Sequence, residues 1–194
     1  MLDDLMAGSR ADAARRRAQF PTAILERRAI QQAPALDAVA ALSRRETVNI
    51  IAEVKRASPS RGRLAGIPDP AKLARSYEQG GAAAISVLTE ERKFLGSLDD
   101  LEAVRAAVNV PVLRKEFIGE EYQILEARAA GADLVLLIVA ALDQATLLRL
   151  KTFTESLGMT ALVEVHTREE FERACEVESK AVSYTHLRAH ETVL

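Results

Sequence analysis

Four charged residues occur at the ends of short apolar runs, where a buried strand normally carries none. Glu53 and Lys55 close one run, Lys115 follows a second, and Glu164 lies near the end of a third. Glu53 and Lys55 are two residues apart, so a strand projects both side chains to the same face. Two carboxylates and two ammonium groups in one partly desolvated cluster can hold one another charged and exchange protons. The pattern predicts acid–base chemistry on an anionic substrate.

Each of these residues alone has a simpler explanation. A strand-end lysine or glutamate is more often a solvated rim residue or half of a structural ion pair. The functional interpretation depends on four such residues ending three different runs in the same way.

The segments after the first runs contain groups suited to such a substrate. Arg56–Gly62 combines hydroxyls, arginines and glycine and can cradle a phosphate, and we expect Thr89, Glu90 and Glu91 to play the same part after the second run. Phe94 and Phe117 lie just beyond two runs, where an aromatic ring either stacks on a planar substrate or closes the end of the core. Both interpretations stay open.

The sequence predicts no metal site and no cysteine nucleophile. His166 follows the last apolar run, but His186 and His190 lie in the C-terminal segment, and Cys175, the single cysteine, falls in a predicted helix. One cysteine excludes an intrachain disulfide and a cysteine-based zinc site within the chain.

Composition is that of an ordinary globular protein. The chain has 194 residues, of which 48% are hydrophobic and 28% charged, and its net charge is −2. The slight negative charge argues against nucleic acid as a partner. The N-terminus opens acidic, unlike a signal peptide, and the longest apolar run, Leu134–Leu142, is far shorter than the roughly 20 residues of a membrane span. We expect a cytoplasmic protein with no membrane partner.

Apolar runs alternate with helix-like segments from residue 48 onward. Runs rich in β-branched residues predict strands at Val48–Val54, Ala83–Leu88, Val110–Leu113, Leu134–Val139 and Thr160–Val165. The segments between and after them predict helices at Asp69–Gln79, Leu98–Val108, Glu120–Ala130, Asp143–Leu157 and Arg168–Glu176. This alternation is typical of βαβ units around a parallel sheet.

Residues 1–47 form a different region, rich in alanine and arginine. They predict two or three short helices. The run Arg15–Arg17 within them predicts a solvated helix face, with an anchor for a phosphorylated ligand as the less common alternative.

Two architectures fit a parallel sheet of this kind, a doubly wound sheet and a (β/α)8 barrel. Both place their chemistry at the carboxyl ends of the strands. Neither G-x-G-x-x-G nor G-x-x-x-x-G-K-[ST] occurs, so the doubly wound alternative lacks its usual support. The sequence favours an α/β fold of the (β/α)8 TIM-barrel type. It has room for about five units, where a whole barrel takes about 250 residues.

Five segments resemble the indole-3-glycerol phosphate synthase family: IIAEVKRASPSRG, ISVLTEERKFLGS, PVLRKEFI, GADLVLLIVAAL and ALVEVHTREE. The resemblance runs from about residue 1 to about residue 180. It implies a TIM-barrel carboxy-lyase of tryptophan biosynthesis acting on a small phosphorylated molecule, 1-(2-carboxyphenylamino)-1-deoxyribulose 5-phosphate. The reaction closes the indole ring with loss of CO2 and water, without a metal or organic cofactor.

The resemblance also implies roles for single residues. Lys115 matches the general acid on the ribulose carbonyl, and Lys55 matches a lysine that binds the anionic substrate and serves in dehydration. Glu53 and Glu164 match glutamates that stabilise the developing cation and move protons. The division of acid and base steps among these four groups stays open. The matching substrate-binding positions are Ser58, for the phosphate, and Phe94, Phe117 and Leu136, for the anthranilate ring.

The resemblance ends at about Lys180. The family continues with three further strands, whereas 181–194 predicts no barrel strand and resembles a translated frame error or adapter sequence. We therefore expect an N-terminal helical extension (1–47), a partial barrel with strands one to five (48–180) and a tail foreign to the family (181–194). Two alternatives to synthase activity remain: a non-catalytic barrel fragment, and another phosphate-binding barrel such as phosphoribosylanthranilate isomerase, which needs a Cys/Asp pair at strand ends.

Overall fold

The structure, a computed structural model, describes residues 1–43 and 48–184. Its elements, in chain order, are α1 (Leu2–Gln19), α2 (Thr22–Gln31), α3 (Ala38–Leu42), β1 (Ile51–Val54), β2 (Ala57–Ser58), β3 (Gly62–Arg63), α4 (Pro70–Gln79), β4 (Ala84–Leu88), α5 (Leu98–Arg105), β5 (Val112–Lys115), α6 (Glu121–Ala129), β6 (Leu134–Ile138), the 3-10 turn η1 (Val139–Ala141), α7 (Gln144–Ser156), β7 (Thr160–Val165), α8 (Arg168–Glu176) and β8 (Ala181–Tyr184).

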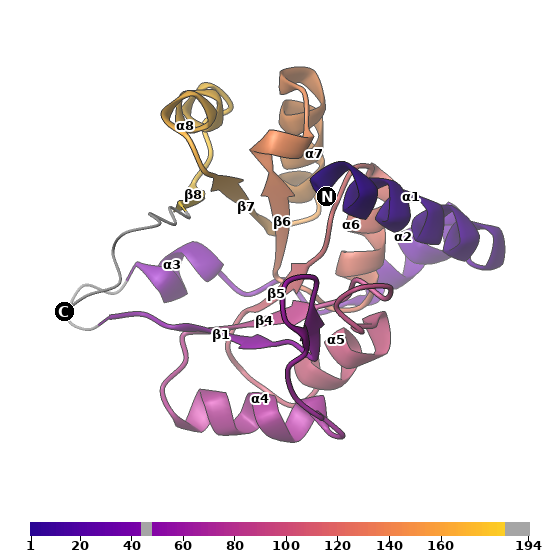
Figure 1. Cartoon of the computed structure of the whole chain (residues 1–194), viewed down its shortest axis with the longest axis vertical. Helices are drawn as coiled ribbons and strands as arrows, with labels where there is room; N and C mark the ends of the chain where they lie inside the picture. The colour runs from indigo at the N-terminus through magenta and orange to yellow at the C-terminus, as the bar shows by residue number, and fades with distance from the viewer. Residues whose placement is uncertain (44–47, 185–194) are drawn as a thin grey trace.

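Six parallel strands form one curved sheet in the order β1-β4-β5-β6-β7-β8 (Figure 1). Neighbouring strands are consecutive in the chain, apart from the small β2–β3 hairpin that follows β1. A doubly wound sheet reverses its strand order at a switch point, whereas a (β/α) barrel does not. The predicted barrel architecture is therefore confirmed, as the part of a barrel that six strands build.

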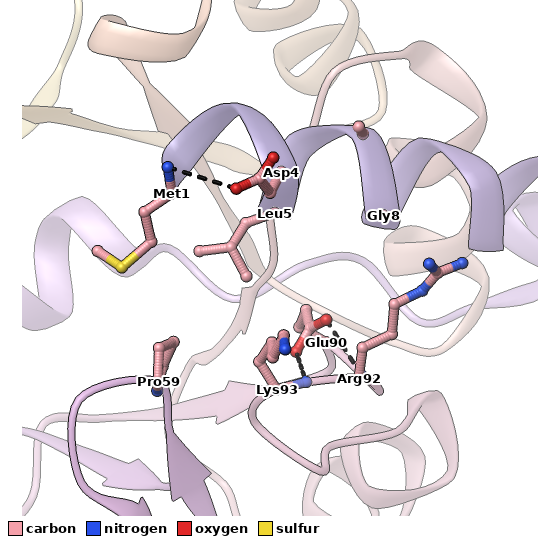
Figure 2. A pocket seen from close by; sticks show the side chains of 9 residues that line it. Met1, Asp4, Leu5, Gly8, Pro59, Glu90, Arg92 and Lys93 are labelled. Atoms are coloured by element: carbon pink, nitrogen blue, oxygen red, sulfur yellow. Dashed lines mark hydrogen bonds and ion pairs between the residues drawn. The ribbon is translucent and has the colours of Figure 1, made fainter.

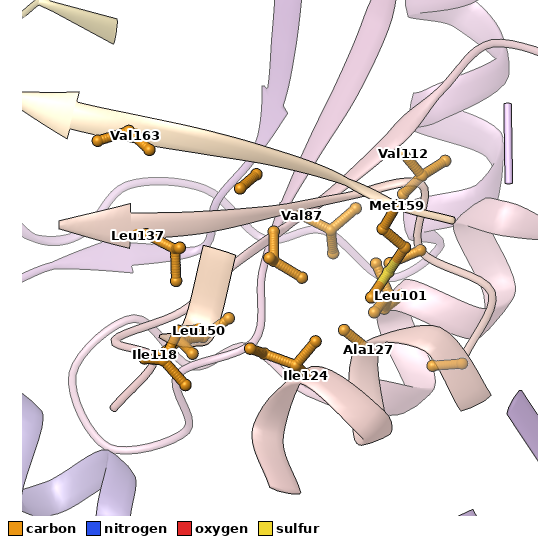
Figure 3. Packing of buried hydrophobic residues seen from close by; sticks show 14 of the residues in the cluster. Val87, Leu101, Val112, Ile118, Ile124, Ala127, Leu137, Leu150, Met159 and Val163 are labelled. Atoms are coloured by element: carbon orange, nitrogen blue, oxygen red, sulfur yellow. The ribbon is translucent and has the colours of Figure 1, made fainter. Parts of the chain in front are cut away.

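The main apolar core lies between the outer side of this sheet and the helices that connect the strands (Figure 3). Strand residues such as Val87, Val112 and Leu137 meet Ile124 of α6 and Leu150 of α7 there. Successive strand residues point to opposite faces. The residues between these core positions therefore face the inner side of the barrel.

A smaller apolar cluster covers that inner side. It contains Leu113, Leu134, Leu136, Ile138 and Leu162, together with Ala38 of α3. The chain before α3 is fixed by Asp133, whose carboxylate accepts the backbone N–H of Leu36 at 2.8 Å and Arg105 at 2.6 Å. Because Asp133 directly precedes β6, these bonds hold the N-terminal segment at the amino ends of the strands.

The N-terminal segment contains three helices, as predicted, but α1 is a long helix rather than a short one. In its Arg15–Arg17 run, Arg15 and Arg17 are exposed, as predicted for a solvated helix face, but Arg16 is not. Arg16 pairs with Glu126 of α6 at 2.5 Å and with Glu91 at 3.0 Å, and Arg17 lies over the Tyr122 ring at 4.6 Å. The run docks α1 against α6 and the loop after β4, because the acidic partners come from distant parts of the chain.

Two strand predictions differ from the structure. β1 begins at Ile51 rather than Val48, and Val48 is 89% exposed. β8 lies in the segment predicted to hold no barrel strand, yet it pairs in parallel with β7 from Leu162–Ala181 to Val165–Tyr184. The prediction that 181–184 forms no strand is wrong, and so is the predicted limit of five strands. The edge of β7 supplies a pairing partner that the local sequence does not reveal. The rest of the predicted tail, 185–194, lies outside the described residues.

Candidate active site

Glu53 lies between two lysines at the carboxyl end of the sheet. Its Oε1 is 2.5 Å from Nζ of Lys55, and its Oε2 is 3.0 Å from Nζ of Lys115. Lys115 belongs to β5, so this contact spans β4, which lies between β1 and β5. We call Glu53, Lys55 and Lys115 the Lys–Glu–Lys cluster. It joins three of the four charged residues predicted from the sequence.

Strand alternation places the cluster on the inner side. Ala52 and Val54 face the outer core, so Glu53 faces inward, and Lys115 shares its side of β5 with the inner residue Leu113. The residue of β4 in register with Glu53 is Ser86. Serine is short enough to leave space for the contact from β1 to β5, and its buried hydroxyl has no hydrogen-bond partner among the described residues.

Electrostatics keep Glu53 ionised. Burial acts to raise the pKa of Glu53, but the hydrogen bonds and charges of Lys55 and Lys115 outweigh it, so this pKa lies below its usual value. With both lysines protonated, the Lys–Glu–Lys cluster carries one net positive charge on the inner side. Such a cluster attracts an anion and offers it hydrogen-bond donors.

Glu164 faces the inner side of β7 but does not join the cluster. Its Oε1 lies 3.4 Å from Nε2 of His166, whose Nδ1 lies 3.5 Å from Glu170 of α8. Leu136 of β6 lies between β5 and β7 in the sheet and is buried in the inner apolar cluster. The two predicted carboxylates, Glu53 and Glu164, therefore lie on opposite sides of the apolar strip that contains Leu136, and among the described residues they have no ion-pair partner in common.

The two predicted aromatic residues meet. The ring centroids of Phe94 and Phe117 are 5.9 Å apart, and the ring planes are tilted by 41°. Phe117 also packs against the inner cluster that contains Leu136. Because Phe117 follows Lys115 by two residues, an apolar wall stands beside the cluster of charges.

Two buried carboxylates, Glu90 and Glu116, hold the loops that carry these rings, a role that the sequence did not predict. Glu90 accepts the backbone N–H groups of Arg92, Lys93 and Phe94 at 3.0, 2.7 and 2.8 Å. Glu116 accepts the backbone N–H of Phe117 at 2.9 Å. The only signal in the sequence was an acidic residue just before each loop, which is equally typical of a solvated position.

The expectation that residues 89–91 cradle a phosphate is wrong. The Thr89 hydroxyl donates to Glu116 at 2.8 Å, Glu90 binds its own loop, and Glu91 pairs with Arg15 and Arg16. All three side chains are engaged in holding the fold, because they are the acceptors and donors to which α1 and the loop after β4 attach.

A pocket of about 670 Å³ opens between α1, the loop after β4 and Pro59 of the β2–β3 hairpin (Figure 2). Ser58, the predicted phosphate contact, precedes Pro59 in that hairpin. None of the four predicted catalytic residues lines this pocket, whereas Glu90 and Pro59, from the two segments predicted to cradle a phosphate, do. Glu53 and Lys55 instead line a second hollow, of about 460 Å³, between β1 and α4.

The described residues offer few other groups suited to metal binding or nucleophilic chemistry. Within 1–43 and 48–184, no group of three or more His, Cys, Asp or Glu side chains could hold a metal ion. Cys175 is exposed on α8 rather than at a strand end. No helix in these same ranges is long and apolar enough to cross a membrane.

Comparison with known proteins identifies relatives of this arrangement. A family model described as indole-3-glycerol phosphate synthase matches residues 2–186, so the match extends past Lys180, the predicted end of the resemblance. The indole-3-glycerol phosphate synthase of Leifsonia xyli subsp. xyli is 63% identical over 182 residues, covering 94% of this chain and 70% of that protein. The one of Mycobacterium avium is 59% identical, covering 94% of this chain and 66% of that protein. The chain thus spans about two thirds of the length of these relatives.

A solved structure is similar in fold. The N-acetylmannosamine-6-phosphate 2-epimerase from Clostridium perfringens superimposes with a TM-score of 0.54, covering 69% of this chain and 60% of that one. The sequence identity is 15%, so this likeness concerns the fold alone.

Proposed function

Since this chain belongs to the indole-3-glycerol phosphate synthase family, we propose that its Lys–Glu–Lys cluster carries out the acid–base steps of indole ring closure. The substrate is 1-(2-carboxyphenylamino)-1-deoxyribulose 5-phosphate, and the reaction takes place in the cytoplasm. The observation that carries the proposal is the position of Glu53, with one carboxylate oxygen on each of two lysines.

Ring closure requires a proton donor at the keto oxygen. The ring carbon that bears the carboxylate bonds to the keto carbon, and the keto oxygen takes a proton and becomes a hydroxyl. The carboxylate then leaves as CO2, and its bonding electrons restore the aromatic ring. Lys115 is suited to donate the proton, because its ammonium group lies on the inner side next to the Phe94–Phe117 wall that receives the anthranilate ring.

Dehydration follows on the same atoms. The new hydroxyl leaves as water, the nitrogen becomes positively charged, and a proton is lost from the neighbouring carbon. Lys55 binds the anionic substrate and assists the departure of the hydroxyl. Glu53 and Glu164, on opposite sides of the Leu136 strip, stabilise the cation and accept the proton. Ser58, in the hairpin after β1, contacts the phosphate.

The alternative of an isomerase has less support. Its acid–base pair requires a cysteine at a strand end, whereas Cys175 lies on α8 and the first strand ends in Glu53 and Lys55. The synthase reaction uses the groups that the inner side presents.

The test compares two lysine variants with the unmodified chain. In an assay that follows the indole product by its fluorescence, we expect Lys115→Met to lower kcat by about 10²- to 10⁴-fold, the usual contribution of a general acid. Lys180→Met is the matched control, because Lys180 is an exposed lysine beside Thr160, at the amino ends of the strands. It should leave kcat unchanged.

Two results contradict the proposal. If the folded chain binds no substrate and gives no product, the non-catalytic alternative is correct. If Lys115→Met keeps full turnover with an unchanged circular dichroism spectrum, Lys115 is not the acid.

A further inference from the structure

We propose that Ser9 of α1 is a positioning residue that holds the backbone of Phe117 in place through a buried clamp with Glu116 and Gln123. The inference rests on the proposed function, since it concerns the wall and the lysine of the same site. It assigns to α1 a specific task in shaping that site.

The clamp is centred on one buried hydroxyl. Ser9 is 3% exposed. Its Oγ donates to Oε1 of Glu116 at 3.0 Å and accepts from Nε2 of Gln123 at 2.8 Å. The hydroxyl therefore bridges the side chain of Glu116, which directly follows β5, and the side chain of Gln123, which lies in α6.

Both of these side chains reach the backbone of Phe117. Glu116 Oε1 accepts the N–H of Phe117 at 2.9 Å, and Gln123 Nε2 donates to its carbonyl oxygen at 3.2 Å. Gln123 also accepts the N–H of Gly119 at 2.8 Å. The peptide groups on both sides of Phe117 are thus fixed by residues that Ser9 links.

The clamp extends to the catalytic lysine. The Thr89 hydroxyl donates to the second oxygen of Glu116 at 2.8 Å, and the Thr89 N–H donates to the carbonyl oxygen of Lys115 at 3.1 Å. Arg114, fully buried, lies 3.7 Å from the same Glu116 oxygen. Glu116 therefore sits in a network that holds the residues on both sides of it, Lys115 and Phe117.

Helix propensity alone does not explain a serine at this position. Ser9 lies inside an alanine-rich helix, where alanine is the better helix former. Removing the hydroxyl leaves a buried carboxylate and a buried amide each without one partner, and such groups rearrange or admit water. The loop that carries the Phe117 ring is the part that this rearrangement moves.

The first test measures hydrogen exchange at the backbone amides of Phe117 and Gly119. We expect Ser9→Ala to speed exchange there by about 10-fold or more, because the clamp loses its centre. Tyr122→Phe is the matched control: the Tyr122 hydroxyl donates to the carbonyl oxygen of Phe20 at 2.9 Å, so this variant also removes one hydrogen bond at α1. It should leave these two amides unchanged. Equal exchange in both variants, or no change in Ser9→Ala, overturns the clamp.

The second test measures the consequence for the reaction. We expect Ser9→Ala to lower kcat by about 10- to 100-fold, as misplaced groups do, with little change in KM, and Ser9→Thr, which keeps the hydroxyl, to restore it. An unchanged kcat in Ser9→Ala shows a purely structural role and overturns the inference. Absence of turnover in the unmodified chain overturns the proposed function instead, while the exchange comparison still decides whether the clamp exists.

Discussion

Carboxylates serve two different purposes in this chain. Glu90 and Glu116 are buried, and backbone N–H groups and hydroxyls occupy their oxygens. Glu53 is part-exposed and pairs with the two lysines of its cluster, whose side chains are 34% and 37% exposed. Buried carboxylates of the first kind hold loops, whereas one of the second kind remains available to a substrate. The two kinds should respond differently to substitution.

Glu53→Gln should cost little stability and much activity. Ion pairs this exposed contribute about 0–1 kcal/mol, so we expect the free energy of unfolding in urea to fall by no more than about 1 kcal/mol at pH 7. Turnover should fall by about 10²-fold, because the shared counter-ion of Lys55 and Lys115 is lost. A stability loss of about 3 kcal/mol or more would make Glu53 a structural residue.

The pH dependence of the same variant has a definite sign. The pKa of Glu53 lies below its usual value of 4.5, so its charge stabilises the fold above that pH. This contribution is lost as the pH falls through the lowered pKa. The stability difference between the unmodified chain and Glu53→Gln should therefore be present at pH 7 and shrink as the pH falls below 4.5. A difference that grows on acidification would contradict the direction of the shift.

At the scale of elements, the repeating unit is a helix, a glycine and a buried strand. Gly131 and Gly158 end α6 and α7 with φ values of 85° and 78°, in the left-handed region that other residues avoid. Their surroundings differ. An added Cβ at Gly131 would lie 2.8 Å from Cγ of Arg105, whereas at Gly158 it would meet nothing within 4 Å. Arg105 cannot easily give way, because it is bonded to Asp133 and to the carbonyl oxygen of Val110.

Gly131→Ala should therefore destabilise the fold more than Gly158→Ala. We expect each to cost about 1–2 kcal/mol for the left-handed backbone, and Gly131→Ala to cost about 1–3 kcal/mol more for the crowding. Urea unfolding of the two variants side by side measures the difference. Equal losses would show that the Arg105 side chain adapts.

At the scale of the whole molecule, the sheet has two open edges in the part that the structure describes. Across residues 1–43 and 48–184, β1 pairs only with β4 and β8 pairs only with β7. Apolar side chains lie exposed beside the β1 edge, including Ile50 at 54% exposure. An open apolar edge is a template for pairing with another chain.

Ile50→Lys should reduce self-association of this chain. We expect the average mass measured by light scattering to rise with concentration in the unmodified chain and to rise less in the variant, because a charge at a sheet edge opposes pairing. Ile30→Lys is the control, since Ile30 is 82% exposed on α2, away from the sheet edge. If both variants associate to the same extent as the unmodified chain, the edge is not where copies meet.

The sequence by itself determined the alternating strands and helices, the barrel type and the residues of the Lys–Glu–Lys cluster. These features are written in local patterns: β-branched runs, glycines after helices, and charges at strand ends. Only the tertiary structure decided that Arg16 docks α1, that β8 extends the sheet, that Glu164 stands apart from the lysines, and that Ser9 joins Glu116. The physical reason is distance along the chain, because each of these outcomes depends on a partner that local periodicity does not specify, such as Glu116, 107 residues from Ser9.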